Sequence, residues 1–150
     1  MNRALNRLRT GLILCRLLPA YVLLGLLKHF VPVKWLARWA WTSPAGTRNR
    51  EAERRLMAGV IRLSQLISLR DRDCLQRSLL LYRVLSRASA DPTLVVGFHR
   101  AGDRILGHAW VVVDGESVIE PEADLCRFSV TLRFGSRGAL LPTWPDRWAA

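Results

Sequence analysis

The sequence predicts an α+β fold in which helices come first and a small antiparallel sheet follows. Residues 49–69 repeat apolar side chains at helical spacing, and a second such run covers 74–87. From Thr93 onward the pattern changes to β-branched and apolar residues, which is typical of strands. Within that part Asp114-Gly115 separates two apolar runs, and this dipeptide favours the two-residue turn of an antiparallel hairpin.

The composition fits one folded domain with a basic surface. The chain has 150 residues, half of them hydrophobic, so it can bury a substantial core. Its formal net charge is +11, and the arginines are spread between leucines instead of forming a compact basic tract. Because no zinc-finger spacing or recognition-helix pattern accompanies this charge, we predict no nucleic-acid partner. An acidic peptide or an anionic membrane surface suits the charge better.

The three cysteines, Cys15, Cys74 and Cys126, are widely separated and form no Cys-x-x-Cys pair. An odd, scattered set favours neither a disulfide framework nor a metal site, and we predict no cofactor. Free thiols fit a reducing cytoplasm. We interpret Cys15 and Cys126 as small buried hydrophobic residues.

Residues 1–41 form a basic region rich in leucine and tryptophan. We predict three helices there, over 3–17, 20–30 and 33–41, with breaks near Pro19 and Pro32. The charge of Arg16 interrupts the apolar run, which argues against a signal peptide. Only eleven residues between Arg16 and Lys28 are uncharged, too few to cross a bilayer.

The end of this region places tryptophans beside cations, namely Trp35, Trp39 and Trp41 with Lys34 and Arg38. Such a stripe is compatible with a membrane interface. Core packing or contact with a protein partner is the commoner use of the same pattern. Both interpretations stay open at this point.

The second region, residues 48–150, follows a linker at 42–47 and contains the predicted catalytic domain. We expect a helix over 49–69 and another over 74–87, with Asp73 as N-cap of the latter. The expected strands are 93–99, 105–113, 117–120 and 128–134, followed by an irregular tail from Gly135.

A cysteine, a histidine and a carboxylate occur in this region at the edges of predicted elements, as in thiol-nucleophile sites. Cys74 begins a helix, where free backbone N–H groups favour the thiolate. His108 leads an apolar strand and would take the thiol proton. Each residue alone is more often structural, so the prediction depends on their combination.

A third group must orient the imidazole, and hairpin geometry favours Glu120 over Asp114 for this role. A turn at Asp114-Gly115 pairs residue 113 with 116, so residue 109 pairs near 120. Glu120 then lies beside His108, whereas Asp114 is about six residues away at roughly 3.3 Å per residue. We therefore predict the site Cys74, His108 and Glu120, with Asp114 as a turn residue.

Three blocks of sequence stand out around these residues. They are Cys74-Leu75-Gln76-Arg77-Ser78-Leu79, Leu94-Val95-Val96-Gly97-Phe98 and His108-Ala109-Trp110-Val111-Val112-Val113-Asp114-Gly115. In this order they resemble the lasso-peptide leader peptidases, transglutaminase-like cysteine proteases, in the form split from its leader-recognition domain. The resemblance covers residues 70–121 and extends more loosely over the basic N-terminal helices.

The resemblance implies a papain/transglutaminase-like α+β fold and hydrolysis of the bond between the leader and the core of a ribosomally made precursor. It makes Cys74 the nucleophile, His108 the general base and then acid, and Glu120 the orienting acid, where the family more usually has Asp. The implied partners are the precursor leader, a separate small leader-recognition protein and an ATP-dependent cyclase. The backbone N–H of Cys74 and the side chain of Gln76 are candidate oxyanion donors.

Two other functions stay open. A transglutaminase-type acyltransferase would use the same thioester chemistry with an amine in place of water. A non-catalytic scaffold with a degenerate site would be held at a membrane surface by residues 3–41.

Overall fold

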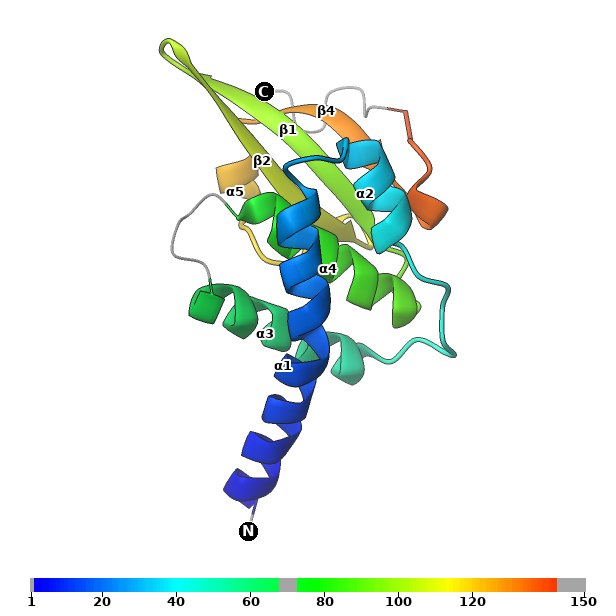
Figure 1. Cartoon of the computed structure of the whole chain (residues 1–150). Coiled ribbons are helices and arrows are strands. Elements are labelled where there is room, and N and C mark those ends of the chain that lie inside the picture. The colour runs from blue at the N-terminus through cyan, green and yellow to red at the C-terminus, as the bar shows by residue number, and fades with distance from the viewer. Residues whose placement is uncertain (1, 68–72, 143–150) are drawn as a thin grey trace.

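The computed structural model describes residues 2–67 and 73–142, with side chains from residue 11 onward. The helices are α1 (Asn2–Leu27), α2 (Val33–Ala40), α3 (Arg50–Ile67), α4 (Cys74–Arg87) and the short α5 (Glu122–Leu125). The strands are β1 (Thr93–Ala101), β2 (Arg104–Val113), β3 (Glu116–Ser117) and β4 (Ser129–Phe134), and a 3₁₀ turn, η1 (Ser136–Gly138), follows. The predicted α+β class is confirmed (Figure 1).

The sheet has helices on one face and a smaller apolar cluster on the other. Its order is β3-β2-β1-β4, and every neighbouring pair is antiparallel. Helix α4 packs on β2 and β1, and α1 and α3 pack on α4 in turn (Figure 1). Because side chains alternate along a strand, Val111 and Val113 of β2 enter the main core, whereas Trp110 and Val112 meet Leu125 of α5.

Helix α1 is continuous, so the prediction of two helices over 3–17 and 20–30 is wrong. Pro19 lies inside it and removes one intrahelical hydrogen bond, which costs roughly 3 kcal/mol. Leu17, Tyr21 and Leu24 on the inner side of the helix are buried. Burial of a large apolar side chain contributes about 1.5–3 kcal/mol each. The burial of these three side chains together contributes more free energy than Pro19 costs, and the helix continues to Leu27.

The predicted helices at 33–41, 49–69 and 74–87 are confirmed as α2, α3 and α4, although residues 68 and 69 lie outside the described part. The hairpin turn is confirmed as well. Asp114 and Gly115 both have positive φ, 55° and 88°, as a type I′ turn requires.

The returning strand of that hairpin is shorter than predicted, because β3 ends at Ser117 instead of Glu120. Val118 still donates its N–H to the carbonyl of Val111 at 3.0 Å. The next carbonyl on that edge of β2 belongs to Ala109, and it accepts a hydrogen bond from Ser78 Oγ of α4 at 2.8 Å. Since the helix occupies this position, the strand cannot continue along it.

Two smaller expectations also need correction. Cys15 and Cys126, predicted to be buried, are both exposed. Cys15 lies on the outer side of α1, and Cys126 follows the short helix α5. The tail is less irregular than predicted, since it forms η1 and a β-bridge between Phe134 and Leu140; residues 143–150 lie outside the described part.

The two predicted regions of the chain meet in one hydrophobic core. Tyr21 of α1 and Leu36 of α2 belong to the same buried cluster as Leu79 of α4 and Phe134 of β4. The division between residues 41 and 48 stays a prediction. Among the described residues, no helix is both long enough and apolar enough to cross a membrane.

Candidate active site

Cys74 is the first residue of α4 and is half-buried. Asp73 occupies the N-cap position, as predicted, but its side chain makes no capping hydrogen bond. Its carboxylate instead accepts a hydrogen bond from Lys28 Nζ at 2.5 Å. The Asp73 side chain therefore does not cap the backbone N–H groups in the first turn of α4. A hydrogen bond with the backbone of Leu75 favours the thiolate of Cys74.

The edge of β2 supplies a second backbone group to the sulfur. The N–H and the C=O of one residue point to the same side of an antiparallel strand. The carbonyl of Ala109 accepts the Ser78 hydroxyl, and the backbone of Ala109 also makes a hydrogen bond that favours the Cys74 thiolate. The N-terminal turn of α4 thus lies where β3 would otherwise run, directly beside His108.

The imidazole of His108 packs against two aromatic rings. Its ring stacks on Phe128 and Trp110, with centroid distances of 5.1 Å and 5.9 Å. On β1 its pairing partner is Gly97, where an added Cβ would come within 3.0 Å of the Trp110 ring. The missing side chain at Gly97 leaves room for Trp110, and the stacked rings fix the plane of the imidazole.

Glu120 lies beside His108, at the position that the hairpin register predicts. Its Oε1 is 3.6 Å from His108 Nε2 and 2.5 Å from Arg77 Nη2. Only 15% of the Glu120 side chain is exposed. The carboxylate is thus shared between an imidazole on the sheet and a guanidinium on α4, one helical turn after Cys74.

The electrostatics of the three groups favour a charged set. Burial raises the pKa of the Cys74 thiol, but the hydrogen bond with His108 and the backbone bonds outweigh it, so that the pKa falls below its ordinary value. Hydrogen bonds with Cys74 and Glu120 raise the pKa of His108 to about 9. For Glu120, burial raises the pKa, while His108 and the charge of Arg77 bring it below the ordinary value. An imidazolium and a carboxylate are therefore the favoured forms near neutral pH, and the Cys74 thiol ionises more readily than an ordinary cysteine.

Asp114 is remote from this set, as predicted. Its carboxylate accepts two hydrogen bonds from Arg48 and forms an ion pair with Arg50 at 2.9 Å. These exposed contacts tie the hairpin turn to the start of α3. Asp114 is a turn residue.

Gln76, a candidate oxyanion donor, faces α1 instead of the thiol. Its Nε2 donates to the carbonyl of Tyr21 at 2.8 Å, and its Oε1 accepts from Lys28 Nζ at 3.2 Å. The side chain is 7% exposed and packs where Gly25 lacks a side chain. Gln76 therefore fastens α4 to α1, and the expectation of an oxyanion role for it is wrong.

The sequence analysis missed two residues of the site, Arg77 and Ser78. Both follow Cys74 at the spacings of three and four residues that share one face of a helix. That spacing was visible in the sequence and could have placed them near the thiol. Their partners, Glu120 and the carbonyl of Ala109, depend on how the helix meets the sheet, which local patterns do not reveal.

The arrangement has the parts of a nucleophilic thiol site. An ionised sulfur at a helix N-terminus can attack a carbonyl carbon, and an adjacent imidazolium can supply a proton to the leaving group. The carboxylate of Glu120, 3.6 Å from His108 Nε2, can fix the orientation of the imidazole. In the described part of the chain, no group of three or more His, Cys, Asp or Glu residues is arranged to hold a metal ion.

Comparison with known proteins assigns the family. The family model of the transglutaminase-like superfamily matches residues 17–133, from within α1 to the end part of β4. That span includes each element that builds the site. Searches of curated proteins and of solved structures give no significant match. With more than half of its length matched, the chain belongs to the transglutaminase-like superfamily.

Proposed function

We propose that the chain is a cysteine peptidase that removes the leader from a lasso-peptide precursor, with Cys74, His108 and Glu120 as its catalytic residues. The observation that carries the proposal is the contact of the Cys74 thiol with His108, whose other side faces Glu120. Membership of the transglutaminase-like superfamily supports thiol chemistry of this general kind. The lasso-peptide assignment is supported by the three sequence blocks that carry the resemblance.

In the proposed reaction the Cys74 sulfur attacks the scissile carbonyl carbon and forms a tetrahedral intermediate. The imidazolium of His108 gives its proton to the leaving amine, the carbon–nitrogen bond breaks, and a thioester remains on Cys74. His108 then accepts a proton from a water molecule, whose oxygen attacks the thioester. The C–S bond breaks, the leader leaves as a carboxylate and the thiol is regenerated.

Two features of the structure support these roles for neighbouring residues. Glu120 forms an ion pair with His108 Nε2 at 3.6 Å, and in this proposal the other ring nitrogen serves the thiol and the leaving group. Arg77 binds the same carboxylate and keeps it ionised, so it is a positioning residue and not a catalytic one. For the oxyanion we keep the backbone N–H of Cys74 as proposed donor, because it lies at the helix N-terminus.

The partners in this proposal are the leader of the precursor, a separate small leader-recognition protein and a lasso cyclase that takes the product. The basic charge of the chain suits an acidic leader or partner surface. Free Cys15, Cys74 and Cys126 suit a cytoplasmic location.

The test is an incubation of the chain with a lasso-peptide precursor and a small leader-recognition protein, followed by mass spectrometry. Hydrolysis gives a free leader acid and a free core amine. The variant Cys74→Ala should give neither, while its thermal unfolding stays close to that of the original chain. Cys126→Ala, which removes an exposed thiol that is not one of the three proposed catalytic groups, is the matched control and should cleave normally.

Three outcomes would contradict the proposal. Cleavage by Cys74→Ala would remove the thiol from the mechanism. A product joined to an added amine, without the free leader acid, would assign the chain to the acyltransferases of the same superfamily. No reaction with any precursor, with thiol alkylation unchanged in His108→Gln, would favour a non-catalytic scaffold.

A further inference from the structure

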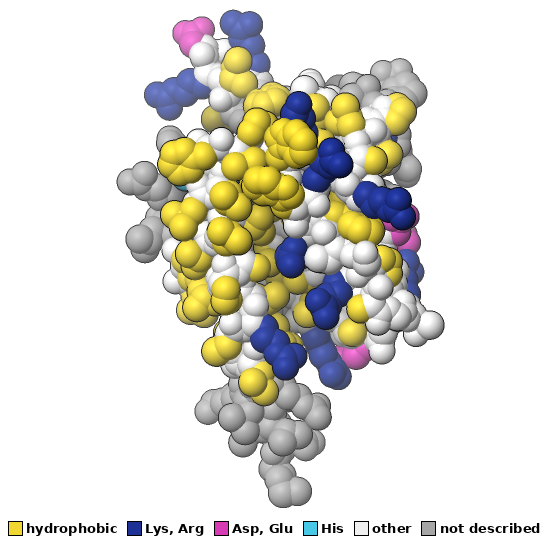
Figure 2. Space-filling model, turned by 45° about the vertical axis from the view of Figure 1, so that its right-hand side comes forward, with side chains coloured by type: hydrophobic (Ala, Val, Ile, Leu, Met, Phe, Trp, Pro, Cys, Tyr) yellow, Lys and Arg dark blue, Asp and Glu magenta, His cyan; other side chains and the backbone are white. Residues whose placement is uncertain are grey.

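A large exposed apolar surface lies on the outer side of α1 and α2. Its members, which we name the α1–α2 face, are Leu12, Leu18, Val22, Leu23, Leu26, Phe30, Trp35 and Trp39. Figure 2 shows hydrophobic side chains gathered over these two helices, with Lys and Arg side chains between and beside them. An exposed apolar area with several large side chains usually marks contact with another molecule or with a membrane.

The face is a continuous stripe because of the helical spacing along α1. Leu18, Val22 and Leu26 recur every four residues on the outer side, whereas Leu17, Tyr21 and Leu24 are buried on the inner side. From Leu12 to Leu26 the stripe runs about 21 Å at 1.5 Å per residue. Phe30, which is 85% exposed, extends it beyond the end of the helix.

The charged residues of α1 and α2 are all basic. No Asp or Glu precedes Glu51 in the sequence, although nine Lys and Arg residues do. Among these, Arg16, Lys34 and Arg38 are exposed on the two helices that form the face. The ligand that covers the face therefore combines an apolar surface with negative charge.

The tryptophans of α2 are placed as at a bilayer interface. Trp35 has Lys34 Nζ at 5.8 Å and the guanidinium of Arg38 at 5.2 Å from its ring centroid. In an interface the indole lies at the level of the headgroups, and long cationic side chains reach the lipid phosphates. An exposed aromatic ring between two cations is suited to that boundary.

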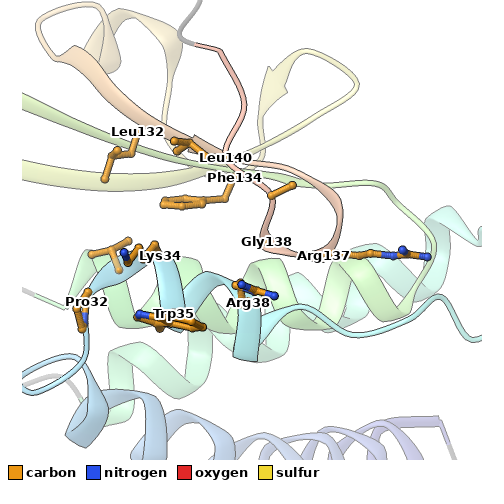
Figure 3. Close-up of a pocket in the computed structure, with 11 residues that line it drawn as sticks. Pro32, Lys34, Trp35, Arg38, Leu132, Phe134, Arg137, Gly138 and Leu140 are labelled. Atoms are coloured by element: carbon orange, nitrogen blue, oxygen red, sulfur yellow. The ribbon is translucent and has the colours of Figure 1, made fainter.

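The groove next to the face has the same chemistry. A cavity of about 720 Å³ lies between α2, β4 and η1, and its walls include Trp35, Leu132 and Phe134. Figure 3 shows Lys34, Arg38 and Arg137 around this cavity, and none of the described residues that line it is acidic. The groove thus repeats the combination of an apolar wall and cationic rim, which fits an anionic amphiphile.

We propose that the α1–α2 face binds the surface of an anionic lipid bilayer. The leucines of α1 enter the acyl region, the tryptophans of α2 lie among the headgroups, and Lys34 and Arg38 contact lipid phosphates. A bilayer supplies apolar depth and negative charge together along the whole stripe, which an acidic peptide without apolar residues does not. This inference does not depend on the proposed peptidase function.

The test is flotation of the full chain with vesicles. One preparation contains equal parts of phosphatidylcholine and phosphatidylglycerol, and the other contains phosphatidylcholine alone. The chain should float with the mixed vesicles, bind the neutral ones more weakly, and be released from the mixed ones by added salt. The lipid-bound fraction gives a partition coefficient for each variant.

Matched substitutions separate the face from the rest of the surface. Leu23→Glu should lower the partition coefficient at least about tenfold, because it places a charge in the acyl region. Ile105→Glu makes a similar change at a 74% exposed position on the β1–β2 hairpin and should leave binding unchanged. The double variant Lys34→Glu, Arg38→Glu should lower the partition coefficient at least about tenfold. The control double variant Arg100→Glu, Arg104→Glu changes the net charge equally on the β1–β2 hairpin and should lower the partition coefficient much less.

The proposal is overturned if the original chain does not float with the mixed vesicles, or if Leu23→Glu and Ile105→Glu float equally. It is also overturned if the chain sediments as a dimer that Leu23→Glu dissociates, because the face is then an interface between two copies. Thermal unfolding of each variant shows that a loss of binding is not a loss of the fold.

Discussion

Glu120 shows how a carboxylate on a short loop can serve a histidine on a strand. It is held from two sides, 3.6 Å from His108 Nε2 and 2.5 Å from Arg77 Nη2. Glu120→Gln keeps the size of the side chain but removes its charge, so the imidazolium loses its counter-ion. We expect kcat/KM for leader cleavage to fall on the order of 10²- to 10⁴-fold.

Asp114→Asn is the matched control for this prediction. It makes the same chemical change in an exposed turn, where Arg48 and Arg50 are the partners. Asparagine also tolerates positive φ, so the turn should keep its shape. The variant should cleave within about twofold of the original rate. A larger loss in Asp114→Asn than in Glu120→Gln would show that Glu120 does not orient His108.

The pH dependence of the site follows from the direction of two pKa shifts. The pKa of His108 is raised to about 9 by Cys74 and Glu120, so the imidazolium is present at neutral pH and is lost as the pH rises through about 9. The pKa of Cys74 is lowered, so its thiolate persists to lower pH than in the unfolded chain. kcat/KM should therefore decline above about pH 9.

Iodoacetamide modification measures the thiolate directly. The alkylation rate at Cys74, followed by mass spectrometry of its peptide, should remain high at pH values where the denatured chain has become slow. His108→Gln should move this profile to higher pH, because the cation that stabilises the thiolate is gone. An unchanged profile in His108→Gln would show that the two side chains are not coupled.

At this scale the sequence predicted that Cys74, His108 and Glu120 lie close together, but it did not predict the residues that support them. The Asp-Gly turn defined the register, since residues 113 and 116 do pair, and this register places Glu120 near His108. The oxyanion role was predicted for Gln76 because it is close to Cys74 in sequence. Closeness in sequence does not determine on which face of the helix the side chain lies.

Among the elements, α2 and the turn after β4 depend on close backbone approach. A Cβ on Gly138 would lie 2.5 Å from the backbone nitrogen of Arg38, whereas a Cβ on Gly102 would meet nothing within 4 Å. Both glycines have nearly the same positive φ, 64° and 61°. Alanine at Gly102 therefore measures the energetic cost of the left-handed backbone alone. Alanine at Gly138 adds the cost of the steric clash with α2.

We expect Gly102→Ala to lower the free energy of unfolding by about 1–2 kcal/mol, the cost of a left-handed conformation with a Cβ. Gly138→Ala should lower it by roughly 1–3 kcal/mol more, because α2 must move away from η1. Urea unfolding of the two variants gives both values. Equal losses would mean that α2 is not tightly packed on this turn.

Local sequence patterns predicted most helices and strands. They did not predict where contacts with other segments override the local preference. Pro19 disfavours the helix locally, but the burial of its neighbours Leu17 and Tyr21 stabilises the helix by more. The strand after Ser117 was predicted from its apolar residues, yet α4 took its pairing position on β2 through Ser78. Both errors come from contacts between segments far apart in the sequence.

For the whole molecule, the N-terminal helices are part of the core. Tyr21, Leu36 and Ala37 are fully buried, so removing residues 1–41 should expose the helical side of α4. We expect this deletion to abolish cooperative thermal unfolding, followed by circular dichroism. Deletion of residues 1–10 removes none of the buried residues named above, and this variant should still unfold cooperatively. A cooperative transition after the longer deletion would show that residues 48–150 fold independently.

The fold class was predictable because it depends on the order of periodic patterns along the chain. The two faces of the sheet follow from alternation in β2, where Trp110 and Val111 point to opposite sides. The outer side of α1 was not predictable in the same way, because residues 17–27 are apolar on every side of the helix. Only the packed structure distinguishes the buried Tyr21 from the exposed Leu23.

One ammonium group joins the outer helix to the nucleophile. Lys28, just after α1, binds both Asp73, the N-cap of α4, and Gln76 in the first turn of that helix. A ligand that displaces the end of α1 would act on these two contacts beside the nucleophile. If such a ligand changes the acidity of the Cys74 thiol, thermodynamic linkage requires that ionisation of the thiol changes the affinity for that ligand by the same factor.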